Sequence, residues 1–97
     1  MTAYFIAFRD KMHDAARYAA YAQKAMPTIA SIPGARVIVG NGALTPIEGE
    51  APDGVVIIEF PDAAAAKAWY DSPAYQAVVG DRLAVTEGRS VIVEGFG

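Results

Sequence analysis

Four short apolar runs, at residues 4–8, 36–39, 55–60 and 90–94, are separated by segments with helical spacing. Their β-branched and aromatic residues favour strands. After the first run, Tyr18, Tyr21, Ala25 and Ile29 keep the spacing of one helix face. Pro27 interrupts that face, which predicts a kink or a break with a new turn. Pro33 and Gly34 predict the end of the helix.

The chain after the third run predicts two short helices in succession. Pro61 ends the strand, and Asp62 is a suitable N-cap for the alanine-rich segment behind it. Ala65, Ala68 and Trp69 are expected to share the face that packs on the sheet. Ser72-Pro73 predicts a new helix start, and Gly80 a kink or an end, followed by a partly helical link over residues 81–88. Residues 44–47 are expected to pair at a sheet edge, weakened by Pro46.

The order of these elements is βαββαβ, which is typical of the split βαβ arrangement of ferredoxin-like α+β folds. Right-handed crossovers place both helical segments on one face of a four-stranded antiparallel sheet. The strands are nevertheless apolar on both faces: Val55 and Ile57 lie on one face of the third run, and Val56 and Ile58 on the other. The helix-free face therefore needs a cover, and we expect a homodimer that forms a dimeric α+β barrel.

Size and composition narrow the possible functions. Residues 1–97 are enough for one domain. The formal net charge of −3 gives no reason to expect nucleic acid or an anionic membrane as a partner, and no apolar segment is long enough to cross a membrane. The chain has no cysteine, which removes disulfides and thiolate chemistry. We expect a cytoplasmic location.

Several motifs make the chain resemble the family called domain of unknown function 1330. They are Gly34-x-Arg36 followed by Val37 and Val39, Glu48-Gly49, Glu59-Phe60-Pro61, the segment from Trp69 to Tyr75, and Arg82. The resemblance covers nearly the whole chain. It implies a dimeric α+β barrel, in a superfamily that includes small cofactor-free monooxygenases, chlorite-dismutase-like proteins and muconolactone isomerases. One departure is Gly40, where members commonly carry an arginine.

Glu59 is the main candidate for chemistry. As an acid within an apolar strand, it is either a general base or ligand anchor, or half of a structural ion pair with Arg82 or Arg36. A catalytic role predicts that Glu59 lines an open cavity. Arg82, the arginine implied by the resemblance, either binds a carboxylate or holds Glu59 or a helix end. Arg36 either lines the barrel or is solvated.

The remaining candidates are aromatic or titratable. The spacing of the tyrosines and of Trp69 indicates core or interface positions, with Tyr21 a candidate to present its hydroxyl to a ligand. The single histidine, His13, lies among polar neighbours and is expected to be solvated. It has no second ligand at metal-binding spacing, so neither a metal site nor a haem or other cofactor is expected.

Two functions follow from these residues. The first is a homodimeric small-molecule-binding or structural module with a pocket at the sheet face, using Arg36, Glu59, Arg82 and Tyr21. The alternative is a cofactor-independent enzyme, monooxygenase-like or isomerase-like, acting on a small aromatic or lactone-like compound with Glu59 as base. The first needs no catalytic group, and a shared fold is a poor guide to chemistry.

Overall fold

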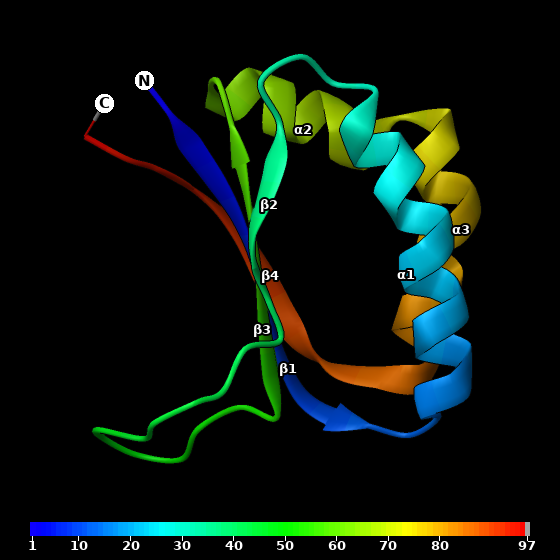
Figure 1. Ribbon diagram of the computed structural model, residues 1–97, viewed down its shortest axis with the longest axis vertical. Helices are drawn as coiled ribbons and strands as arrows, with labels where there is room; N and C mark the ends of the chain where they lie inside the picture. The colour runs from blue at the N-terminus through cyan, green and yellow to red at the C-terminus, as the bar shows by residue number, and fades with distance from the viewer. Residues whose placement is uncertain (97) are drawn as a thin grey trace.

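The computed structural model describes residues 1–96, in which all helices lie on one side of a single twisted antiparallel sheet (Figure 1). The elements in order are β1 (Ala3–Met12), α1 (Ala15–Ala30), β2 (Arg36–Gly40), β3 (Gly54–Phe60), α2 (Ala63–Asp71), α3 (Pro73–Val85) and β4 (Thr86–Glu94). The strand order β2-β3-β1-β4 leaves β2 and β4 at the edges. This arrangement confirms the predicted ferredoxin-like α+β fold.

Helix α1 is continuous despite its internal proline. The Asp14 carboxylate accepts a hydrogen bond from the Arg17 amide at 3.0 Å, which caps the helix. Pro27 lies one turn from the end, where the helix continues to Ala30. Gly34 then takes a φ of +80°, a left-handed conformation that favours glycine, and the chain turns into β2.

A single serine joins α2 to α3. The Ser72 hydroxyl donates to the Trp69 carbonyl at the end of α2 and accepts from the Tyr75 amide at the start of α3. The predicted end of the helix at Gly80 is wrong, because α3 continues to Val85 and β4 begins at the next residue. The predicted edge strand over residues 44–47 is also wrong, since that segment has no regular structure.

The core lies between the sheet and the helices. Phe60, Trp69 and Tyr75 are its largest fully buried side chains. The rings of Trp69 and Tyr75 lie 4.1 Å apart, and the Trp69 indole donates a hydrogen bond to the Thr28 hydroxyl at 3.0 Å. The inward face of α2 differs from the prediction: Ala66, not Ala68, is buried beside Trp69.

The strand register fixes which side chains face the helices. Phe5 lies opposite Ile58, and both belong to the core. Their neighbours along the strands, Ile6 and Ile57, also lie opposite each other and therefore face the other way. Val91 pairs with Ile6 on this helix-free face and is 47% exposed. The sheet is therefore apolar on both faces, as the sequence predicts.

Candidate functional site

Two adjoining cavities lie between the sheet and the helices. One has a volume of about 140 Å³ and the other of about 130 Å³. They share four lining residues: Ala7, Val56, Tyr18 and Arg82. Ala7 and Val56 are opposite each other in the two central strands, while Tyr18 comes from α1 and Arg82 from α3. We call the two cavities together the cleft.

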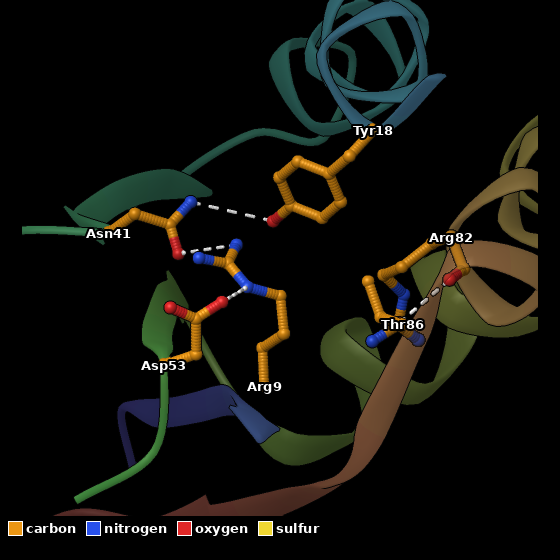
Figure 2. A network of polar contacts seen from close by, with 6 residues as sticks. All are labelled: Arg9, Tyr18, Asn41, Asp53, Arg82 and Thr86. Carbon is orange, nitrogen blue, oxygen red and sulfur yellow. Dashed lines mark hydrogen bonds and ion pairs between the residues drawn. The ribbon is translucent and has the colours of Figure 1, made fainter. Parts of the chain in front are cut away.

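The first, polar cavity has basic and hydroxyl-bearing walls. Arg9 lies on the same face of β1 as Phe5 and Ala7, and its guanidinium is 4.9 Å from the centre of the Tyr18 ring. Figure 2 shows this guanidinium held by Asp53 and Asn41, with Nε–Oδ2 and Nη1–Oδ1 distances of 3.2 and 3.1 Å. Asn41 also donates to the Tyr18 hydroxyl at 3.4 Å. No carboxylate is among the described residues that line this cavity.

Gly54 makes room for this arrangement. It lies opposite Arg9 in the pairing of β1 with β3, and a Cβ atom at this position would collide with the Arg9 guanidinium. The side chain of Arg9 therefore crosses β3 close to Gly54, at a point where a larger residue would force the guanidinium to shift. Glycine at the start of β3 thus leaves space for the Arg9 guanidinium to lie against the sheet.

Arg82 enters the cleft from the last turn of α3, apart from the Arg9 group (Figure 2). Its Nε atom is buried and has no hydrogen-bond partner within residues 1–96. The dashed line beside it joins the Thr86 hydroxyl to the Arg82 backbone carbonyl, at 2.7 Å, and does not involve the guanidinium. A buried donor without an acceptor is destabilising. Buried donors without a partner are rare in native structures, so the Arg82 Nε atom needs a physical explanation.

The second, apolar cavity extends from Arg82 towards the far end of α1. Its other walls are mainly aliphatic and aromatic: Phe5, Ala25, Met26, Ile29, Val37, Ile58, Trp69 and the Tyr21 ring. The Tyr21 hydroxyl is paired with the Tyr75 hydroxyl at 2.7 Å. Burial raises the pKa of both phenols above the ordinary value for tyrosine. Both are therefore protonated at neutral pH, and neither is a base.

The structure does not bring the four predicted site residues together. Tyr21 and Arg82 line the cleft. Glu59 lies beside Tyr4 on the helix-free face and accepts a hydrogen bond from Arg36 Nε at 2.8 Å. The hydrogen bond to Glu59 is the main cause that raises the pKa of Arg36 above its ordinary value. Of the two alternatives for Glu59, the ion pair with Arg36 is the one present, and Glu59 lines neither cavity of the cleft.

His13 lies outside the cleft. Its imidazole is half exposed and contacts the Glu87 carboxylate across the start of β4. Over the part of the chain that the structure describes, no three histidine or carboxylate side chains gather as a metal site would require. Among the same residues, no helix is long and apolar enough to cross a membrane.

Sequence reasoning missed Arg9, Tyr18 and Asn41 as cleft residues. A signal for Arg9 existed, because strict alternation places it on the same face of β1 as Phe5 and Ala7. It was obscured because the polar residues Arg9, Asp10 and Lys11 look like the end of a strand, whereas β1 continues to Met12. The position of Asn41 depends on its left-handed backbone, with a φ of +58°, a conformation that asparagine adopts more readily than most residues.

The fold and the cleft define a small ferredoxin-like α+β protein, and comparison with known proteins places it in a family. Residues 2–96 match the sequence model of the domain of unknown function DUF1330. The chain belongs to this family, which confirms the resemblance found in the motifs. No match was found among curated proteins.

Solved structures share the fold at low sequence identity. A protein of unknown function from Rhodopseudomonas palustris is 24% identical, with a TM-score of 0.74, over 99% of this chain and 83% of that one. A dimeric ferredoxin-like protein of unknown function from Jannaschia sp. is 18% identical, with a TM-score of 0.71, over 98% and 100%. A mutant of SnoaB, a cofactor-independent oxygenase from Streptomyces nogalater, is 14% identical, with a TM-score of 0.65, over 99% and 93%.

Proposed function

We propose that this protein is a homodimeric small-molecule-binding module whose ligand occupies the cleft of each protomer. The observation that carries the proposal is Arg82, which lies at the junction of the polar and the apolar cavity and whose buried Nε atom has no hydrogen-bond partner within residues 1–96. A few convergent polar groups beside an apolar cavity are typical of a ligand site. The absence of cysteine is consistent with a reducing compartment, and we propose the cytoplasm.

The binding proposal is tested by closing the cleft. Ala7 lines both cavities, so Ala7→Leu fills the space they share. Amide chemical shifts would be followed by NMR as phenol, indole and small aromatic acids are added. We expect shifts at Tyr18, Val56 and Arg82 in the wild type and their loss in Ala7→Leu. Ala64→Leu, on the exposed side of α2, is the matched control and should respond as the wild type does. Wild-type shifts confined to other surfaces would contradict the proposal.

The helix-free face of the sheet is the reason that we propose a dimer. Ile6, Ile57 and Val91 form a continuous apolar row across the three strands β3, β1 and β4. The segment between β2 and β3 projects to the same side of the sheet (Figure 1), and it carries Ile47, which is 85% exposed. Apolar surface of this kind marks an interface. The similar protein from Jannaschia sp. is described as dimeric, which supports a second copy as the cover.

Light scattering tests the assembly. At micromolar concentration we expect twice the mass of the 10.2 kDa chain. Val91→Lys places a charge in the apolar row and should give the monomer mass, because an unpaired buried charge is strongly unfavourable at an interface. Ala20→Lys, on the exposed side of α1, introduces the same charge away from the sheet and should remain dimeric. A monomeric wild type would refute the dimer.

The enzymatic alternative has less support in this geometry. A cofactor-independent monooxygenase or isomerase with Glu59 as base needs that carboxylate at the substrate, but Glu59 is held by Arg36 on the other face of the sheet. Among the described residues that line the two cavities, none is a histidine, aspartate or glutamate. The likeness to SnoaB, at 14% identity, extends to the fold alone.

A further inference from the structure

We propose that the ligand of the cleft is a hydrophobic monocarboxylic acid, whose carboxylate pairs with Arg82 and whose apolar body fills the apolar cavity. This inference rests on the proposed function, since it names the class of molecule that the cleft accepts. It draws on three observations: the charge balance around the polar cavity, the geometry of the free guanidinium edge, and the size and lining of the apolar cavity.

The charge balance identifies Arg82 as the arginine that lacks an anion. Three arginines line the polar cavity, and two of them have carboxylate partners: Arg9 pairs with Asp53, and Arg89 with Asp10. Within residues 1–96, Arg82 forms no ion pair and no side-chain hydrogen bond with a carboxylate, although the chain has more acidic than basic residues. The missing partner is therefore an anion that the protein itself does not supply. A water molecule would satisfy Nε but would leave the charge without a counter-ion.

The free edge of the guanidinium indicates the shape of that anion. A carboxylate has two oxygens in one plane and accepts two parallel hydrogen bonds from an arginine. The Nε atom has no partner of its own, and a carboxylate that reaches this edge of the guanidinium would supply one. The Tyr18 hydroxyl accepts a hydrogen bond from Asn41, so its own proton remains free to donate into the same cavity. A phosphate dianion would need a second unpaired cation, but the charges of Arg9 and Arg89 are already balanced.

The apolar cavity indicates the rest of the molecule. Its volume of about 130 Å³ is close to the size of an interior cavity that accepts benzene, about 150 Å³. Two tyrosines are among its lining residues: the Tyr21 hydroxyl is already paired with Tyr75, and the Tyr18 hydroxyl accepts a hydrogen bond from Asn41. The body of the ligand is therefore apolar and about the size of one aromatic ring or a six-carbon chain. Arg82 lines both cavities, so the carboxylate lies next to this body, within a short linker of it.

The experiment compares matched molecules by calorimetry and NMR on the full chain. The acid is 3-phenylpropanoate, its neutral isostere is 3-phenylpropanamide, and phenyl phosphate is the dianionic alternative. We expect the acid to bind at least 10-fold more tightly than the amide, because hydrogen bonds to a charged group discriminate by about one to two orders of magnitude. Arg82→Gln should remove this preference, because it should weaken binding of the acid at least 10-fold and binding of the amide less than 3-fold. Arg36→Gln changes an arginine that lies outside both cavities and pairs with Glu59, and it should change the affinity for neither molecule more than 3-fold.

Stability without ligand provides a second measurement. If Arg82 awaits a ligand, its buried and unsatisfied Nε donor opposes folding, and Arg82→Met should unfold at the same or a higher urea concentration than the wild type. A clear loss of stability in Arg82→Met would mean that Arg82 is a structural residue and would overturn the inference.

The outcomes separate this inference from the proposed function. If acid and amide bind equally and both change the chemical shifts of cleft residues, the inference of a carboxylate ligand is overturned. The cleft then remains a binding site. Tighter binding of phenyl phosphate would overturn it in favour of a phosphorylated ligand. If none of the three molecules shifts the cleft residues, both the inference and the proposed function fail.

Discussion

The hydroxyls of Tyr21 and Tyr75 form a buried hydrogen bond, 2.7 Å long, next to the apolar cavity. Changing either residue to phenylalanine leaves the hydroxyl of the other tyrosine buried and without this hydrogen-bond partner. We expect each single change to lower the free energy of unfolding by about 1–2 kcal/mol. The double change should cost clearly less than the sum, because no orphan remains. Urea unfolding of the four proteins measures this coupling, and strictly additive losses would contradict it.

The sequence indicated some of the cleft residues and not others. It named Tyr21 from helical spacing and Arg82 from the family motif, and both line the cleft. Glu59 lies on the opposite face from Ile58 and Phe60, and since β3 is apolar on both faces, the pattern does not say which face the helices cover. That depends on tertiary packing. The pairing of Arg9 with Asp53, 44 residues away, likewise follows from the sheet register and not from any local pattern.

Helices α1 and α3 are joined by an ion pair at the surface. Arg17 donates two hydrogen bonds to Asp81 Oδ1, at 3.1 and 2.8 Å, and Lys24 lies 3.9 Å from Oδ2. The hydrogen bond from Arg17 holds the pKa of Asp81 below its ordinary value of 3.8. The ionised carboxylate therefore stabilises the fold above that value, and the contribution is lost as the pH falls through the lower pKa of the folded state.

Asp81→Asn should remove this acid-dependent contribution. We expect the urea midpoint of the variant to lie below that of the wild type at pH 7, and the difference to shrink as the pH is lowered from about 4 to 2. Asp71→Asn is the control, because it removes an ion pair that lies within α2 and joins no two elements. A difference between wild type and Asp81→Asn that is constant from pH 7 to pH 2 would show that the carboxylate does not act through its charge.

At the scale of elements, the sequence predicted the strands and helices where local signals agree. Asp62 and Ser72-Pro73 correctly marked helix starts, since a capping side chain acts on the backbone three residues away. Gly80 does not end the helix, because glycine destabilises a helix by only about 1 kcal/mol relative to alanine. The packing of its neighbour Val79 in the core outweighs this loss. Residues 44–47 remain outside the sheet, where Pro46 cannot donate to a ladder.

The whole molecule has two layers and one uncovered apolar face, which couples its stability to its concentration if that face is the dimer interface. A dimer that unfolds to separate chains gains stability as protein concentration rises. For two chains of 97 residues, a tenfold increase should raise Tm by about 3 °C. Scanning calorimetry over a hundredfold range measures this shift. A Tm that does not change with concentration would indicate that the fold does not depend on a second copy.

Val91→Lys separates assembly from binding. Val91 and its apolar row lie on the helix-free face of the sheet, and none of these three residues lines either cavity of the cleft. The monomeric variant should therefore lose the concentration dependence of Tm and still bind 3-phenylpropanoate within about 3-fold of the wild type. At 100 times its dissociation constant, the acid should stabilise either form by about 2.7 kcal/mol per site. Loss of binding together with the dimer would mean that the partner completes the site, and that the cleft of one protomer is only half of it.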